Sequence, residues 1–267
     1  MLASIFETLP AGIEGIRRRR PLIHNIANLV VANAVANALL ALGASPAMVE
    51  NSEEAADLAR MADAVVINLG TVSSDLAAAM RLTTASAAAA GKPWVLDPVA
   101  VGVLGYRTRL AGELIANKPA VIRGNASEIA ALAGDDGGGG KGVDSTLDTE
   151  AALAGARRLA ERTGSTVVVS GAIDRITDGE RMVAIANGHP IMAQVTGTGC
   201  ISTALIGAFL PVSPGAFTAA AQAMLTMAVA GEMAAERSEG PGTWSVAFLD
   251  VLYSVDGAQI LERAKIS

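Results

Sequence analysis

Residues 195–200 read VTGTGC and lead directly into ISTALIGAFL, an apolar run typical of a buried helix. Glycines let the backbone turn tightly and let a ligand approach it closely. The first turn of a helix has unpaired amide groups and the positive end of the helix dipole. Gly197, Thr198 and Gly199 are therefore predicted to bind a phosphate, or the charge on a phosphoryl group during transfer. A purely structural glycine turn before a helix explains these letters equally well.

Cys200 is the only cysteine of the chain and follows that turn. A thiol at a helix N-terminus is expected to have a lowered pKa and more thiolate character. Three roles are open: covalent nucleophile, proton acceptor or small core residue. A nucleophile would need a histidine partner, and the sequence places neither His24 nor His189 beside it.

Two acidic residues follow predicted strands. Asp97 ends a short apolar run, and Asn125 and Glu128 form the pattern NxxE at the start of a helix. Carboxylates beside an anion-binding turn suit Mg²⁺ bound to nucleotide phosphates, which predicts a metal role for Asp97 and Glu128. Structural alternatives remain for both: a capping box at Asn125 or Ser127, and a strand-ending turn at Asp97-Pro98.

Two phosphate-binding motifs are absent. The letters GTGCIS at 197–202 lack the third glycine of the dinucleotide fingerprint. The run GDDGGGGKG at 134–142 is no Walker A loop, because Asp135 takes the place of its first glycine and Gly142 that of its Ser/Thr. We interpret that run, with its glycines 137–140, as a mobile surface loop.

Short β-rich runs alternate with longer helical ones along the chain. The strands are continuous apolar runs, which indicates a parallel sheet covered by helices on both faces. Polar residues and glycines collect where these strands end, the edge at which such sheets bind ligands. The predicted strands span 22–26, 46–49, 64–69, 94–97, 121–123 and 166–170, and the predicted helices span 29–42, 73–90, 110–117 and 150–163.

The rhythm changes after residue 170. Residues 173–176, 182–186 and 191–194 are short strand candidates, with Asp178-Gly179 as a hairpin turn. From Cys200 onward the chain is predicted to be nearly all helix. No internal repeat and no long linker divides it.

Composition limits the function classes. The chain has 267 residues, 51% of them hydrophobic, and a net charge of −6, which disfavours nucleic acid as a partner. The basic run 17–20 is interpreted as a solvated helix end. The alanine-rich stretch 216–231 contains Gln222 and is shorter than the ~20 apolar residues of a membrane span. Glu7 and Glu14 precede the basic run, the reverse of a signal peptide. A soluble, cytoplasmic protein is expected.

Taken together, these segments resemble the 4-methyl-5-(2-hydroxyethyl)thiazole kinase family of the ribokinase-like superfamily. The resemblance extends from about residue 21 to 208. The motifs taken together, in this order, are specific for the family, although VTGTGC or NxxE alone is not. It includes PLIHNIANLVVANAVANALLALGASPAMV, VINLGT, LDPVAVG, IRGNASEI, GKGVDS and VTGTGC.

The resemblance implies a fold, an assembly and a reaction. It implies that residues 1–267 form a single ribokinase-like kinase domain, a three-layer α/β/α sandwich with a mostly parallel central sheet. It also implies a homotrimer with active sites at the subunit interfaces, ATP as co-substrate, Mg²⁺ as cofactor and the primary hydroxyl of the thiazole alcohol as acceptor.

The same resemblance assigns substrate roles on the acceptor side. Met48 and Gly197 match substrate-contacting positions, and Asn25 and Gly70 are expected near the thiazole. Ala27 and Leu29 depart from the polar or aromatic residues common in the family, which puts the fine choice of acceptor in question.

On the donor side, Arg123, Ser170 and Asn125 match nucleotide-binding positions, and Asp97 and Glu128 match the acids near Mg²⁺. Cys200 falls where most ribokinase-like kinases have an aspartate that takes the proton of the attacking hydroxyl. Phosphoryl transfer through a loose transition state asks mainly for positioning and charge stabilisation. We therefore assign Cys200 a positioning and weak-base role.

Two other functions fit parts of the pattern. One is a related kinase acting on hydroxymethylpyrimidine or a sugar, although the apolar segment before Met48 favours a small apolar heterocycle. The other is a non-catalytic nucleotide-binding oligomer, which would need the glycine turn but not the two acids.

Overall fold

Parallel strands form the centre of the computed structural model, which describes residues 2–134 and 149–267. Within these residues the strands make one eight-stranded sheet in the order β2-β1-β3-β4-β5-β6-β7-β8, with neighbours parallel up to β6 and antiparallel from there on. The strands are β1 (Leu22–Ile26), β2 (Ser45–Ala47), β3 (Ala64–Asn68), β4 (Trp94–Asp97), β5 (Val121–Asn125), β6 (Thr166–Ser170), β7 (Asp174–Thr177) and β8 (Met182–Ile185).

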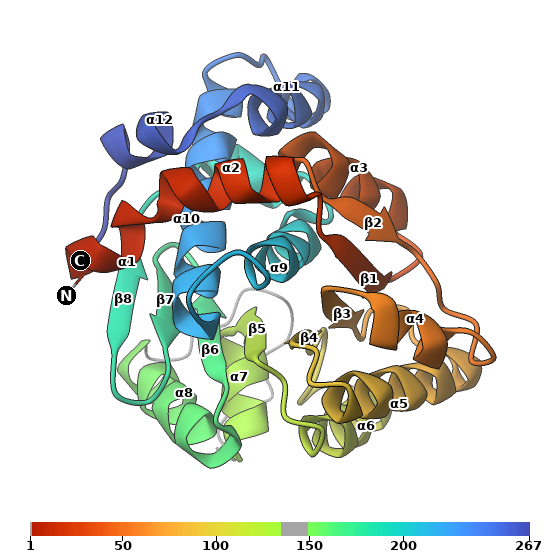
Figure 1. Cartoon of the computed structure of the whole chain (residues 1–267). Coiled ribbons are helices and arrows are strands. Elements are labelled where there is room, and N and C mark those ends of the chain that lie inside the picture. The colour runs from red at the N-terminus through yellow and green to blue at the C-terminus, as the bar shows by residue number, and fades with distance from the viewer. Residues whose placement is uncertain (1, 135–148) are drawn as a thin grey trace.

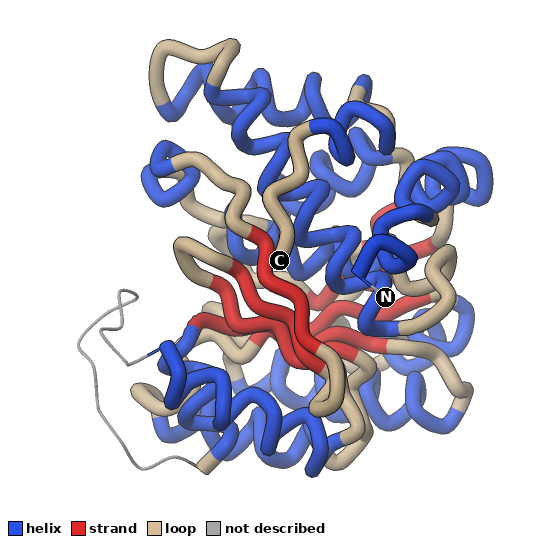
Figure 2. The backbone as a smooth tube through the Cα atoms, turned by 90° about the vertical axis from the view of Figure 1, so that its left-hand side faces the viewer, coloured by secondary structure: helices blue, strands red, loops and turns tan. Residues whose placement is uncertain are grey.

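Helices cover both faces of the sheet (Figures 1 and 2), because its strands are buried on both sides. One layer comprises α4 (Ala55–Met61), α5 (Ser74–Ala89), α6 (Gly105–Ile115), α7 (Ala126–Ala133) and α8 (Thr149–Thr163). The other comprises α1 (Leu2–Glu7), α2 (Leu9–Arg19), α3 (Ala32–Leu42), α9 (Thr198–Phe209), α10 (Ala216–Ala235), α11 (Pro241–Ser254) and α12 (Gly257–Glu262). The predicted three-layer α/β/α architecture is confirmed.

Two predicted elements differ from the structure for identifiable reasons. The strand predicted at 191–194 is wrong: Pro190–Gln194 form the short 3₁₀ helix η1, which begins at a proline and is capped by His189, whose Nδ1 accepts from the Ile191 amide at 3.2 Å. The helix predicted from residue 29 begins at Ala32. Residues before it form a turn, because the Asn28 side chain accepts from the Val30 amide at 3.1 Å.

The basic run 17–20 is not simply a solvated helix end. The Arg17 guanidinium donates to the carbonyls of Leu252, Tyr253 and Val255, which are orphan acceptors at the end of α11. The glycine run at 137–140 lies outside the described residues. Among the helices that the structure describes, none combines the length and apolar character that a membrane span requires.

The sheet has a switch point between β1 and β3. The chain leaves β1 through α3 in one layer and leaves β3 through α5 in the other, so the two connections diverge above the carboxyl ends of these strands. Ligands of open α/β sheets bind in the crevice that such divergence creates. The fold therefore predicts a site above β1, β3 and β4.

Helix α9 lies directly on the sheet because a glycine faces it. A Cβ on Gly207 would lie 2.6 Å from Val66 Cγ2 and 3.3 Å from Ile23 Cγ2. This close approach positions the first turn of α9 over the strand ends.

Gly207→Ala should therefore destabilise the protein by about 1–3 kcal/mol, because the added methyl overpacks a core of branched side chains. Gly112→Ala in α6 is the matched control, since Gly112 is exposed and a Cβ there meets nothing within 4 Å. Helix propensity predicts that the control gains about 0.5–1 kcal/mol. Urea unfolding of the two variants measures both, and equal stability would show that α9 packs less tightly than described.

Candidate active site

The first turn of α9 and the Arg123 guanidinium form one cationic site. Gly197 takes a left-handed φ of 94° and begins the helix. The Arg123 guanidinium occupies the space beside Gly199, where a Cβ would lie 2.8 Å from its Nη1. Arg123 Nε is buried without a hydrogen-bond partner among the described residues. Amide groups, helix dipole and arginine thus converge where an anion can bind.

A cavity of about 520 Å³ opens from this turn. That volume is typical of small-molecule sites. Its lining includes the predicted residues Arg123, Asn125, Ser170, Thr198 and Gly199, together with apolar residues such as Met224, Met227 and Ala228. The structure therefore brings together all three residues predicted to bind nucleotide with two of the three residues of the glycine turn.

A chain of hydrogen bonds joins three strand ends beneath the turn. Asn28 Nδ2 donates to Asn68 Oδ1 at 3.0 Å, and Asn68 Nδ2 donates to Asp97 Oδ2 at 2.8 Å. The Thr203 hydroxyl, from α9, donates to the same Asp97 oxygen at 2.9 Å. Asp97 is thereby held in one orientation at the switch point of the sheet.

Burial raises the pKa of Asp97 to about 6. The nearby Glu128 carboxylate raises it further, whereas the Arg123 charge and the hydrogen bonds from Thr203 and Asn68 lower it. The carboxylate is 2% exposed. A buried acid with a perturbed pKa in a cleft is typical of a functional position.

Cys200 does not have the thiolate character expected of it. Burial, followed by the Asp97 charge, raises the pKa of its thiol to about 11 and outweighs the hydrogen bonds and the Arg123 charge. Its Sγ lies 3.4 Å from Asn28 Nδ2, which donates to it. The expectation of a lowered pKa is wrong, because desolvation and a neighbouring carboxylate act more strongly here than the helix N-terminus.

Glu128 completes a capping box, the alternative left open by its sequence pattern. Asn125 Oδ1 accepts from the Glu128 amide at 2.9 Å, and Glu128 Oε2 accepts from the Asn125 amide at 2.9 Å. Glu128 Oε1 also accepts from the Ala100 amide at 2.9 Å. The carboxylate is therefore oriented by two backbone amides, those of Asn125 and Ala100, and each oxygen retains a second lone pair.

Residues predicted on the acceptor side lie outside the cavity that follows the turn. Gly70 belongs to the switch point, where its amide donates to Asn68 Oδ1 at 2.9 Å and a Cβ would collide with Asn28. Asn25 is buried, and its Oδ1 has no partner among the described residues. Met48 follows edge strand β2 and is 36% exposed.

His24 orients the segment beside Met48. Its Nε2 lies 2.7 Å from the Val49 carbonyl, and since a carbonyl only accepts, Nε2 carries the proton. Burial lowers the pKa of His24. His24 is thus a neutral structural residue and does not pair with Cys200, whose thiol contacts Asn28.

Sequence reasoning missed three residues of the site: Asn28, Thr203 and Asp174. Asn28 and Thr203 belong to the hydrogen-bond chain. The only sequence signals for them were the motif NIAN, which ends at Asn28, and the polar character of Thr203 within an apolar helix. Asp174 lines the cavity and accepts from the Gly171 amide at 3.0 Å. Burial raises the pKa of Asp174 to about 6 against that bond and the Arg123 charge.

Asp97 and Glu128 are the residues that could hold a divalent cation. Among the described residues no group of three or more His, Cys, Asp or Glu side chains could bind a metal by itself. Mg²⁺ bound to nucleotide phosphates needs only one or two carboxylates, because phosphate oxygens and waters complete its six ligands. The donor set therefore fits a cation that arrives with a nucleotide.

Comparison with known proteins gives consistent matches. A model of the hydroxyethylthiazole kinase family matches residues 13–258. A hydroxyethylthiazole kinase of Granulibacter bethesdensis is 60% identical over 250 residues, covering 94% of this chain and 91% of the relative. The structure of a hydroxyethylthiazole kinase protein from Pyrococcus horikoshii has a TM-score of 0.90 at 41% identity and covers 98% of both chains.

A more distant match concerns the fold alone. A ribokinase-like superfamily protein from Enterococcus faecalis has a TM-score of 0.62 at 16% identity, over 86% of each chain. The ribokinase-like fold implied by the sequence resemblance is thereby confirmed.

Gly199→Ala tests the cationic turn. The added methyl would displace the Arg123 guanidinium, so the affinity for ATP should fall by about tenfold or more, as expected on loss of a charged hydrogen bond. Gly242→Ala is the matched control, because Gly242 is also the second residue of a helix and a Cβ there meets nothing within 4 Å. Calorimetric titration with ATP measures both variants. If both variants bound ATP with the same affinity, Arg123 would have no part in anion binding.

Proposed function

The chain belongs to the hydroxyethylthiazole kinase family, and from this premise we propose that its site transfers the terminal phosphoryl group of ATP to the primary hydroxyl of 4-methyl-5-(2-hydroxyethyl)thiazole. The product is the thiazole phosphate used in thiamine salvage. The observation that carries the proposal is the Arg123 guanidinium against the first turn of α9, at the mouth of a cavity of about 520 Å³. A single cysteine and ATP as donor fit a cytoplasmic location.

The donor nucleotide occupies that cavity. Its terminal phosphates face the α9 amides and Arg123, which stabilise the charge that develops during transfer. Ser170 and Asn125 lie on the same wall. The Ser170 hydroxyl donates to the Gly124 carbonyl at 3.2 Å. This bond joins the ends of β5 and β6 beside the phosphates.

Asp97 and Glu128 would hold Mg²⁺, which would neutralise phosphate charge. The chain contributes an oriented pair of acids, since Asn68 and Thr203 bind one Asp97 oxygen and two backbone amides bind Glu128. An ionised Asp97 is the better acceptor for these donors.

The acceptor alcohol lies at the switch point, near Gly70, Asn25, Gly197 and Met48. Cys200 stays a neutral thiol near pH 7, because the pKa of its thiol is raised to about 11. The positioning part of its proposed role is therefore favoured over the base part. A loose transition state needs little help from a base, so the hydroxyl needs orientation first.

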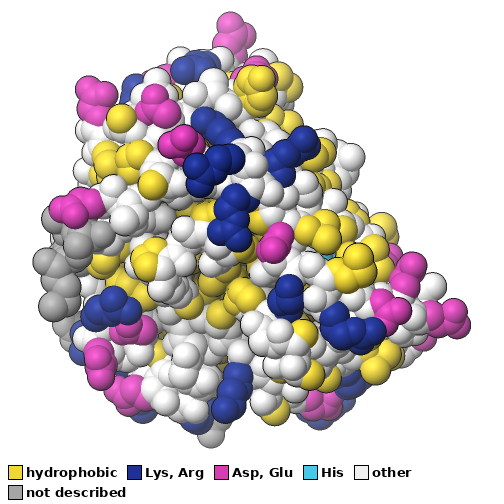
Figure 3. All heavy atoms as spheres, viewed as in Figure 1, with side chains coloured by type: hydrophobic (Ala, Val, Ile, Leu, Met, Phe, Trp, Pro, Cys, Tyr) yellow, Lys and Arg dark blue, Asp and Glu magenta, His cyan; other side chains and the backbone are white. Residues whose placement is uncertain are grey.

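Subunit contact completes the acceptor side in this proposal. Leu29 and Val30 are 87% and 64% exposed, and Met48 follows the edge strand. Hydrophobic side chains gather over β2 and the segment that follows it, on the right of the view in Figure 3. Exposed apolar clusters on a soluble chain are typical of interfaces, which supports a homotrimer with interfacial sites. The single eight-stranded sheet likewise supports one domain over residues 1–267.

Coupled ADP release with the thiazole alcohol, hydroxymethylpyrimidine and a sugar tests the reaction. The thiazole alcohol should have the highest kcat/KM, and activity should depend on added Mg²⁺. A higher kcat/KM for the pyrimidine or the sugar would show that the protein is instead a related kinase acting on that acceptor. ATP binding without transfer to any of the three would favour a non-catalytic nucleotide-binding oligomer.

Asp97→Asn should lower kcat by about 10²-fold or more while the protein stays folded, because it removes a charge that acts on the transition state. Because burial raises the pKa of Asp97 from 3.8 to about 6, the wild-type protein loses folding free energy as pH rises from about 4 to about 6, and the loss is complete above that range. Relative to wild type, the variant should therefore gain roughly 2 kcal/mol between about pH 4 and pH 7. Glu113→Gln, at an exposed ion pair with Arg81, is the control. A pH-independent difference would contradict a buried charge.

A further inference from the structure

One part of the cavity lining is a segment with little regular structure. Residues 186–197 connect β8 to α9, and this connection lines the cavity with Asn187, Gly188, His189, Pro190 and Met192. Their only regular element is the short helix η1. A wall of this kind needs contacts from elsewhere to keep one position.

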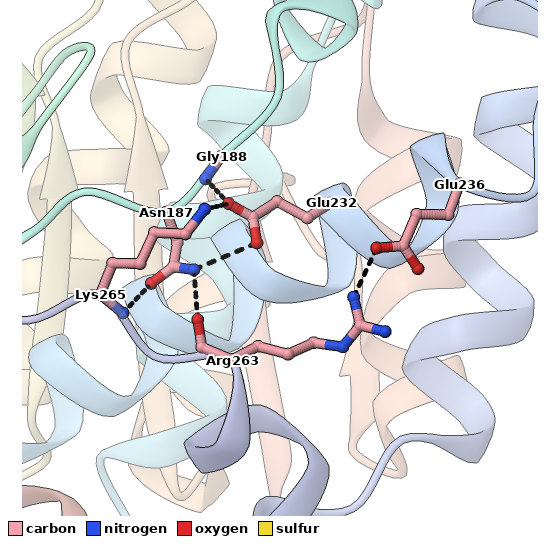
Figure 4. Close-up of polar contacts among 6 residues, drawn as sticks. All are labelled: Asn187, Gly188, Glu232, Glu236, Arg263 and Lys265. Atoms are coloured by element: carbon pink, nitrogen blue, oxygen red, sulfur yellow. Dashed lines mark hydrogen bonds and ion pairs between the residues drawn. The ribbon is translucent and has the colours of Figure 1, made fainter.

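Glu232 of α10 supplies the first of these contacts (Figure 4). Its Oε1 accepts from the Gly188 amide at 2.9 Å, and its Oε2 accepts from Asn187 Nδ2 at 3.1 Å. Gly188 has a left-handed φ of 135°, which favours glycine there. The carboxylate therefore binds two successive residues of the wall at once.

The C-terminal end of the chain supplies the second set. Asn187 Nδ2 also donates to the Arg263 carbonyl at 2.8 Å, and Asn187 Oδ1 accepts from the Lys265 amide at 2.6 Å. The Lys265 ammonium donates to Glu232 Oε1 at 2.9 Å. Ser267 and Ala184 exchange two backbone bonds of 2.8 and 3.0 Å, so residues 263–267 run along the free edge of β8.

Charge and burial make this cluster more than a surface ion pair. Burial raises the pKa of Glu232, but the bonds from Gly188, Lys265 and Asn187 outweigh it and lower that pKa below its usual value. Asn187 is 5% exposed, and both of its amide hydrogens are used within the protein. Asn187 therefore has no hydrogen left to donate to a ligand and acts through the segment it holds.

The neighbouring residue of α10, Gly231, contacts another part of the same wall. Met192 lies against Gly231, where a Cβ would collide with the Met192 sulfur. The Met192 carbonyl accepts from the Thr198 hydroxyl at 3.2 Å. A continuous path thus leads from Glu232 through the wall to the first residue of α9, the helix whose N-terminus faces the phosphates.

We propose that Asn187, Glu232 and the C-terminal segment 263–267 form a clamp that positions the 188–192 wall for the donor nucleotide. This clamp rests on the proposed function, since it presumes that ATP occupies the cavity. Asn187 and Glu232 are positioning residues. Their loss should weaken ATP binding and leave binding of the alcohol at the switch point unchanged.

The test compares Glu232→Ala, Asn187→Ala and Lys265→Met with Glu236→Ala. Glu236 is the C-cap residue of α10 and accepts from the Arg263 guanidinium at 2.6 Å in an exposed ion pair. The clamp uses only the backbone carbonyl of Arg263, so Glu236→Ala removes a neighbouring carboxylate without removing a clamp bond and is the matched control. Loss of hydrogen bonds to a charged group predicts that Glu232→Ala raises the KM for ATP about tenfold. The KM for the alcohol should stay at the wild-type value, and Glu236→Ala should match wild type in both.

Glu232→Gln should restore part of the ATP affinity, because its carbonyl oxygen still accepts from the Gly188 amide. Lys265→Met removes only the ammonium, so it tests the clamp even where the alanine variants do not fold. Both KM values rising together with a lower unfolding temperature, or an unchanged KM for ATP in Glu232→Ala and Lys265→Met, would overturn the clamp. Calorimetric ATP titration of the same variants judges it independently of turnover. If the wild-type protein showed no kinase activity, that result would instead count against the proposed function.

Discussion

The candidate site depends on one contact, that of the Arg123 guanidinium with the first turn of α9. Arg123 can lie beside α9 only because Gly199 has no side chain, and α9 can reach that position only because Gly207 lets it rest on β1 and β3. Two glycines in one helix therefore decide where positive charge concentrates. Buried cationic groups are stable only with an anionic partner nearby, which explains both the acids at the strand ends and the affinity expected for phosphate.

Burial of the Asp97 charge lowers the stability of the fold. Asp97 is buried among Asn68, Thr203 and the Cys200 thiol, and burial raises its pKa to about 6 despite Arg123. A hydrophobic residue there would favour folding more. A charge kept at a folding cost is characteristic of sites that use it, because preorganised charge needs no rearrangement during reaction. Burial and the Asp97 charge together also suppress the thiolate form of Cys200.

The two sides of the site have different supports. The acceptor side is built on strand ends and short bonds among Asn28, Asn68 and Gly70, inside the rigid centre of the sheet. The donor side includes an irregular segment whose position depends on α10 and on residues 263–267, far away in sequence. In the proposed reaction, the centre of the sheet therefore supports the acceptor and the peripheral segments support the donor.

The sequence by itself determined the layers, the strands of the parallel sheet and the edge where the site lies, because buried parallel strands and helix starts leave local patterns. It also proposed roles for Asp97 and the glycine turn and, through the family resemblance, for Arg123, and the structure places these groups close together. Only the tertiary structure decided the pKa of Cys200 and the parts played by Asn28, Thr203 and Glu232. Desolvation, charge coupling and long-range hydrogen bonds depend on which segments meet in space, and no spacing along the chain records that.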